Sequence, residues 1–149
     1  MARILVVDDD PLICSAMQTW LESNGFEVVV ADGGRTGLNA LERSAFDVMI
    51  VDIFVPGMDG FESIRTFHQR APEVPIIATS GLMFREHHGP APDFLGMAAH
   101  LGAAYCLRKP FKAWELVEAI DQCLLEPVVR RKNGTHAARR ISLLAALRH

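Results

Sequence analysis

Two patterns of apolar and polar residues alternate along the chain. Five short apolar runs, rich in β-branched residues, are bounded by turn-forming residues, which is typical of buried strands. Between these runs, apolar residues recur at intervals of three and four, which is typical of amphipathic helices. The expected strands are residues 3–7, 28–30, 48–52, 74–80 and 104–107.

Capping residues help to place the predicted helices. Asp10 is suited to cap a helix that begins at Pro11, and Gly25 is suited to end it. The remaining helices are expected around residues 38–41, at 61–70, at about 92–101 and at 114–124. We expect the last helix to bury one face, made of Trp114, Leu116, Val117, Ile120, Cys123 and Leu124.

The order of these elements predicts the fold class. Strands alternate with helices five times, and the strands are continuous apolar runs with no polar alternation. This combination indicates an α/β domain in which a five-stranded parallel sheet is covered by helices on both faces. A chain of 149 residues suits one such domain.

Charge and cysteine usage narrow the function classes. No apolar run reaches the roughly 18 residues of a membrane span, so we expect no membrane partner. Three cysteines without motif spacing indicate reduced thiols in the cytoplasm and give no zinc site. Residues 1–126 hold all 18 acids and nine bases, a net charge of −9, whereas residues 127–149 hold six bases.

Four of the predicted strands end in a polar side chain. Asp8 and Asp9 follow the first strand, Asp52 ends the third, Ser80 ends the fourth, and Lys109 follows the fifth. In a parallel sheet these ends share one edge, which is where open α/β sheets bind ligands. The sequence therefore predicts a pocket that combines three carboxylates, a hydroxyl and an ammonium.

These groups together are suited to phosphoryl transfer. Three crowded carboxylates repel one another unless a cation intervenes, and Mg²⁺ prefers oxygen ligands of this kind. Mg²⁺ and Lys109 would neutralise phosphoryl oxygens, so that Asp52 can act as a nucleophile and become an aspartyl phosphate. Ser80 would then donate a hydrogen bond that exists only in the modified state, which makes it a candidate switch residue.

The same motifs resemble the receiver domain of two-component response regulators. The resemblance covers about residues 2–126, and we expect the receiver domain to comprise residues 1–126. The resemblance is to the stand-alone, chemotaxis-regulator-like type, which is a phosphoacceptor and not an enzyme. The segments that carry it are Ile4–Pro11, Asp52 with Pro56–Gly60, Pro75–Gly81 and Lys109–Phe111.

The resemblance implies a flavodoxin-like sheet of order 2-1-3-4-5. It implies Mg²⁺ held by Asp9, Asp52 and the main-chain carbonyl of Phe54, with Asp8 acting partly through water. It also implies a cis peptide bond between Lys109 and Pro110. The implied partners are a sensor histidine kinase or phosphotransfer protein that phosphorylates Asp52 and a downstream protein target; a homodimer stays open.

Three departures from the family pattern affect these expectations. The family often has an aromatic switch residue three positions before its lysine, but Cys106 stands there and Tyr105 should face the other side of the sheet. The 81–91 connection is long, and its His87 and His88 fit solvated loop residues better than a metal pair. Apolar Phe54 and Leu82 would not orient an attacking water, which predicts a long-lived phosphoryl group.

The basic segment 127–149 is too short for a helix-turn-helix domain, although residues 137–147 could form one short amphipathic helix. We expect a frayed extension, or one that packs on its own domain or on a second copy. A basic docking segment for an acidic partner or nucleic acid is the alternative. Six bases without interleaved aromatic residues give nucleic acid little support.

A second function is compatible with part of the motif set. A small phosphatase resembling the haloacid dehalogenase class would use Asp8 as nucleophile and Asp10 as acid, with Ser80 and Lys109 binding phosphate. That alternative leaves Asp52 unexplained. A dinucleotide-binding domain fits poorly, because the glycines at 33–37 follow the second strand and lack the required spacing.

Overall fold

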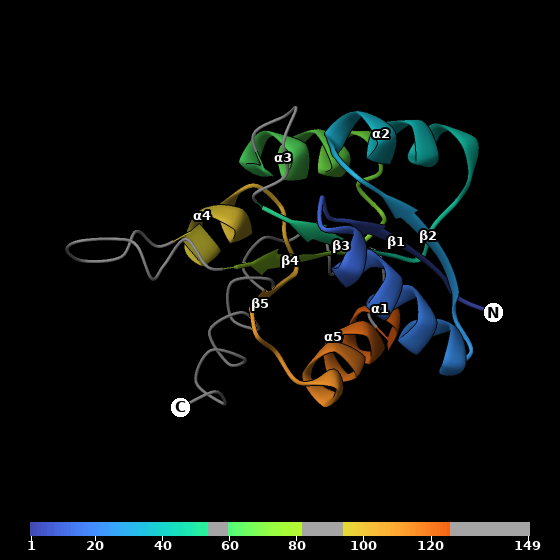
Figure 1. Cartoon of the computed structure of the whole chain (residues 1–149). Coiled ribbons are helices and arrows are strands. Elements are labelled where there is room, and N and C mark those ends of the chain that lie inside the picture. The colour runs from blue at the N-terminus through green and yellow to red at the C-terminus, as the bar shows by residue number, and fades with distance from the viewer. Residues whose placement is uncertain (54–59, 82–93, 126–149) are drawn as a thin grey trace.

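The computed structural model describes residues 1–53, 60–81 and 94–125. Strands and helices alternate regularly through these ranges (Figure 1). The strands are β1 (Arg3–Val7), β2 (Glu27–Ala31), β3 (Val48–Asp52), β4 (Ile76–Ser80) and β5 (Tyr105–Arg108). The helices are α1 (Pro11–Ser23), α2 (Gly34–Arg43), α3 (Gly60–Arg70), α4 (Phe94–His100) and α5 (Ala113–Leu125).

The five strands form one parallel sheet in the order β2-β1-β3-β4-β5. This finding confirms the predicted flavodoxin-like order. The central strand β3 is buried along its whole length, as its apolar run predicted. At the β2 edge, Val29 and Val30 remain 38% and 39% exposed, so the sheet is less well covered there.

Helices cover both faces of the sheet and enclose two separate apolar cores. α1 and α5 lie on one face, and α2, α3 and α4 lie on the other (Figure 1). The core under α2–α4 includes Met49, Phe67 and Cys106, whereas the core under α1 and α5 includes Ile50 and Tyr105. Because successive strand residues point to opposite faces, each strand contributes to both cores.

The predicted inner face of the last helix was wrong at two of its residues. Leu116, Ala119, Ile120 and Cys123 are buried, but Trp114 is 56% exposed and Leu124 is 39% exposed. In a helix with 3.6 residues per turn, Trp114 lies about 160° from the direction of Leu116. Trp114 was predicted to be buried because it is apolar, but it faces solvent when Leu116 faces the core.

Among the helices of residues 1–53, 60–81 and 94–125, none combines the length and apolar character that crossing a bilayer requires.

Candidate functional site

The polar residues that end the strands meet at the carboxyl edge of the sheet. Asp52 is the last residue of β3 and pairs with Thr79 of β4, one residue before Ser80. Asp8 directly follows β1, and Lys109 directly follows β5. The parallel register thus carries side chains from four strands to one edge, as the sequence predicted.

The β1–α1 connection holds Asp8 in a fixed position. The backbone N–H of Asp8 donates to the carbonyl of Ala31 at 3.0 Å, which extends the β1–β2 ladder by one residue. Its Oδ1 accepts a hydrogen bond from the N–H of Asp10 at 3.0 Å, and the side chain is almost fully buried. Asp10 in turn caps α1 by accepting from the N–H of Leu12 at 2.9 Å, which confirms its predicted role as a helix cap.

A thiol supports Asp8 from α1. The Sγ–H of Cys14 donates to the main-chain carbonyl of Asp8 at 3.2 Å. Burial raises the pKa of this thiol, and the charges of Asp8 and Asp10 raise it further, so the sulfur keeps the proton that it donates. Sequence reasoning missed this contact; the available signal was the position of Cys14 in the buried stripe of α1, one turn after Asp10.

Three carboxylates gather at this edge. Asp8, Asp9 and Asp52 each offer an oxygen, and these three oxygens all lie within 4.8 Å of one another. Asp8 and Asp52 are buried and Asp9 is exposed, so the cluster opens to solvent on one side. Converging carboxylate oxygens with an open side suit a hard divalent ion that keeps some of its waters, which is the chemistry of Mg²⁺.

The ammonium of Lys109 bridges the two buried carboxylates. Its Nζ lies 2.7 Å from Oδ2 of Asp8 and 3.2 Å from Oδ2 of Asp52. Burial alone would lower the pKa of Lys109, but the hydrogen bond to Asp8 and the charges of Asp52 and Asp8 outweigh it, and the pKa is raised. The lysine is therefore charged at neutral pH. The peptide bond between Lys109 and Pro110 is cis.

Ser80 contributes a buried hydroxyl to the same edge. Its side chain is fully buried, and its Oγ has no hydrogen-bond partner within the described residues. The backbone around it is well anchored, because its carbonyl accepts from the N–H of Lys109 at 2.7 Å. A buried hydroxyl without a partner costs free energy, and Ser63 is the other buried serine of this kind among the described residues.

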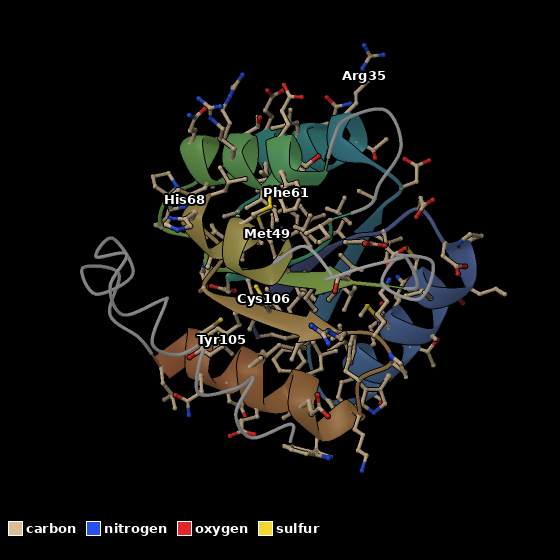
Figure 2. The ribbon with its side chains drawn as sticks, turned by 90° about the vertical axis from the view of Figure 1, so that its left-hand side faces the viewer. Arg35, Met49, Phe61, His68, Tyr105 and Cys106 are labelled. Atoms are coloured by element: carbon tan, nitrogen blue, oxygen red, sulfur yellow. The ribbon has the colours of Figure 1, made fainter. Side chains whose placement is uncertain are left out.

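Tyr105 and Cys106 lie on opposite faces of the sheet, as strand alternation predicted (Figure 2). Tyr105 is 2% exposed in the core under α1 and α5, and Cys106 is 4% exposed in the core under α2–α4. The position where the family often has its aromatic switch thus holds a small buried thiol. The only tyrosine of the chain is on the wrong face to take its place.

Several predicted features fall outside the described residues. They are Phe54 with its main-chain carbonyl, residues 55–59, Leu82, His87, His88 and the basic segment 127–149. The expected metal ligand at Phe54 and the apolar pair Phe54 and Leu82 therefore stay predictions.

Comparison with known proteins identifies the family to which the fold belongs. The sequence-family model named response regulator receiver domain matches residues 4–121 of the chain. The transcriptional regulatory proteins GlrR of Escherichia coli K12 and QseB of Escherichia coli O157:H7 are each 33% identical to the chain, over 83% and 89% of its length. A CheY-like receiver domain from Methanospirillum hungatei JF-1 superposes with a TM-score of 0.74 at 29% identity, covering 83% of this chain and 94% of that one.

These relatives differ from the chain in extent. The aligned region makes up only 26% of GlrR and 55% of QseB, so the likeness concerns one part of those proteins. That part is the one that brings together the acidic cluster and the lysine, since the family match runs from β1 to α5. The chain belongs to the family of response regulator receiver domains.

Proposed function

We propose that the chain is a phosphoacceptor in which Asp52 is phosphorylated by a sensor histidine kinase or a phosphotransfer protein. The observation that carries this proposal is the bridge of Lys109 between Asp8 and Asp52 beside Asp9. An ammonium and a carboxylate at contact distance, at an edge open to solvent, can receive and neutralise a phosphoryl group. Family membership supports the same role.

The residues present fit a bound Mg²⁺. Asp9 and Asp52 would hold it directly, Asp8 would act partly through water, and the main-chain carbonyl of Phe54, outside the described residues, would complete the protein ligands. When bound, the ion supplies positive charge to the phosphoryl oxygens and to the carboxylates around it. Its presence would also relieve repulsion among the three carboxylates, in addition to the contacts that Lys109 makes with Asp8 and Asp52.

The transfer would make Asp52 the nucleophile. A carboxylate oxygen of Asp52 attacks the phosphorus of a phosphohistidine, a P–O bond forms, and the P–N bond breaks. The electron pair of that bond returns to the imidazole of the donor, which takes up a proton. Lys109 can exchange its contact with Asp52 for one with a phosphoryl oxygen, since its Nζ already lies 3.2 Å from that side chain.

Ser80 and Lys109 would change their contacts when Asp52 is phosphorylated. The Ser80 hydroxyl, which has no partner within the described residues, would donate to a phosphoryl oxygen once Asp52 is modified. Because Ser80 ends β4, a shift of its side chain would be transmitted to the connection that follows. Protein–protein contacts that depend on that connection would then change with phosphorylation.

Labelling with a small phosphodonor tests the proposal. The purified chain is incubated with acetyl phosphate and MgCl₂, and intact-protein mass spectrometry measures addition of one phosphoryl group. We expect labelling of wild type and of Asp121→Asn, a control on the exposed side of α5, and none of Asp52→Asn. Undiminished labelling of Asp52→Asn would refute the assignment.

The phosphatase alternative predicts a different result in the same assay. There, Asp8→Asn would abolish catalytic turnover of the phosphodonor, whereas Asp52→Asn would leave it intact. The geometry disfavours Asp8 as a nucleophile, because its Oδ1 accepts from Asp10 and its Oδ2 accepts from Lys109. Release of inorganic phosphate, measured beside the mass, separates the two functions.

A further inference from the structure

Helix α5 presents a mixed acidic and apolar stripe to solvent. Trp114, Glu118, Asp121 and Leu125 follow one another at intervals of four, three and four residues, which places them on one side of the helix. Trp114 is 56% exposed and Leu125 is 77% exposed, while Asp121 is exposed and Glu118 is half-buried. We call these four residues the outer stripe of α5. It lies opposite the buried stripe that contains Leu116, Ile120 and Cys123.

The charge of α5 is of one sign. The helix contains Glu115, Glu118 and Asp121 and no lysine or arginine. Large apolar side chains at both ends of the outer stripe, with two acids between them, would suit a segment that carries both bases and apolar residues. Trp114 and Leu125 are both exposed in the structure, so the two apolar ends of the outer stripe are available for such a contact.

The chain itself supplies a segment of this chemistry. Residues 127–149, which we call the basic tail, contain six bases and no acid, and Glu126 alone separates them from α5 in the sequence. Arg139 and Arg140 are followed by Ile141, Leu143, Leu144 and Leu147. The tail thus has positive charges that complement the acids of the outer stripe, and apolar residues that can pack on Trp114 and Leu125.

The connection is long enough for the tail to reach the stripe. The 13 residues of α5 span about 20 Å at 1.5 Å per residue. The 13 residues from 126 to 138 can span up to about 45 Å when extended, so residues 139–148 can lie against any part of α5. A tethered segment has an effective local concentration in the millimolar range, which makes a modest contact sufficient.

We propose that residues 139–148 dock on the outer stripe of α5 in the same molecule. Arg139 and Arg140 pair with Glu118 and Asp121, and the leucines of the tail cover Trp114 and Leu125. The contact uses none of the residues of the acidic cluster, so the proposal does not depend on the phosphoacceptor role. It would control access of other proteins to α5.

Fluorescence of Trp114 tests this proposal. The chain has two tryptophans, so Trp20→Phe leaves Trp114 as the only one. In the full chain we expect Trp114 to be partly protected from acrylamide. Reversing the tail charges with Arg139→Glu and Arg140→Glu should raise its quenching constant by roughly twofold and shift its emission to the red, because the indole returns to water. High salt should do the same.

Two further variants make the test specific. Arg35→Glu with Arg65→Glu changes the charge equally on exposed positions of α2 and α3, across the sheet from α5, and should leave quenching unchanged. Glu118→Arg with Asp121→Arg, combined with the reversed tail, should restore protection. Equal quenching in all variants would overturn the proposal. Protection that disappears on dilution would overturn it too, because the tail of a second copy would then cover the stripe.

Discussion

The side chain of Lys109 lies 2.7 Å from that of Asp8, although 101 residues separate the two in the sequence. One residue follows the first strand of the chain and the other follows the last, and both strands end at the same edge. The pair is almost fully enclosed, with the lysine side chain 16% exposed and the aspartate side chain 3% exposed. In such surroundings the attraction between the charges is weakly screened, so the ammonium stabilises both the fold and the acidic cluster.

Stability should therefore depend on the charge of Lys109 at alkaline pH. The folded pKa is raised above the unfolded value of about 10.4, so the contribution of the ammonium is complete below about pH 10 and is lost as pH rises through the folded pKa. Lys109→Met should lower the free energy of unfolding by about 3 kcal/mol at pH 8 and by less near pH 11. Urea unfolding at both pH values measures the difference.

Lys112→Met provides the matched control, because Lys112 is exposed and three residues away. It should change stability by less than about 0.5 kcal/mol at both pH values. A constant difference between wild type and Lys109→Met from pH 8 to pH 11 would contradict the role assigned to the charged form.

Removal of the exposed carboxylate should weaken metal binding without damage to the fold. Asp9 offers an oxygen to the acidic cluster, whereas the neighbouring Asp10 caps α1. We expect Asp9→Asn to weaken Mg²⁺ binding by about tenfold or more, since one charged ligand is lost. Asp10→Asn should bind normally, because asparagine caps helices as well as aspartate does. Isothermal titration calorimetry measures both; equal affinities for the two variants would argue against a metal ligand at Asp9.

Removal of the Ser80 hydroxyl should stabilise the unphosphorylated protein. Ser63 and Ser80 both have a fully buried Oγ without a partner in the described part of the chain. Replacing either by alanine removes an uncompensated desolvation, which should raise the free energy of unfolding by about 1 kcal/mol. Only Ser80→Ala should also abolish the change in hydrogen exchange that follows phosphorylation. A loss of stability in Ser80→Ala would mean that its hydroxyl already has a partner.

The sequence predicted the sheet well because its signals are local and repeated. The apolar runs have the length of strands, and Asp8, Asp52 and Ser80 stop them at the same edge. Alternation alone was enough to place Tyr105 and Cys106 on opposite faces. Strand ends fix where a side chain emerges, so the convergence of Asp8, Asp52 and Lys109 could be predicted from one-dimensional information.

Contacts that depend on distance or phase could not be predicted in this way. The bond from Cys14 to the carbonyl of Asp8 uses a main-chain acceptor that every residue possesses, so no residue type marks it. The prediction that Trp114 is buried was wrong for another reason. An apolar residue in the first turn is compatible with several orientations of the buried face of the helix, and only packing against the sheet selects one. The Ser80 hydroxyl has no hydrogen-bond partner among the described residues, and this can be recognised only from the three-dimensional structure.

A methyl group added at Gly37 should destabilise the protein although it favours the helix. Its Cβ would lie 2.8 Å from Cζ of Phe67 and 3.2 Å from Cγ2 of Val7, and Phe67 is fully buried and unable to move aside freely. Gly37→Ala should therefore cost about 1–3 kcal/mol, which exceeds the gain of up to about 1 kcal/mol in helix propensity. Urea unfolding measures the loss. In a Phe67→Leu background, Gly37→Ala should cost less free energy of unfolding than it does in wild type. An equal cost in both backgrounds would show that the ring of Phe67 is not the cause of the loss.

The sequence also predicts a long lifetime for the phosphoryl group on Asp52. Phe54 and Leu82 stand two positions after Asp52 and Ser80 and are apolar, so we expect that they would not orient an attacking water. Phe54→Asn introduces a side chain that can accept and donate hydrogen bonds. We expect it to shorten the half-life of the aspartyl phosphate by about tenfold, which corresponds to about 1.4 kcal/mol of barrier. Decay of the phosphorylated mass after removal of the donor measures this half-life.

Phe54→Leu separates polarity from size in that experiment. Leucine is smaller than phenylalanine but equally unable to orient a water, so its half-life should stay near that of wild type. If Phe54→Leu decays as fast as Phe54→Asn, the bulk of the phenyl ring controls access of water to the site. If all three proteins decay alike, hydrolysis is limited elsewhere, and the apolar pair does not set the duration of the signal.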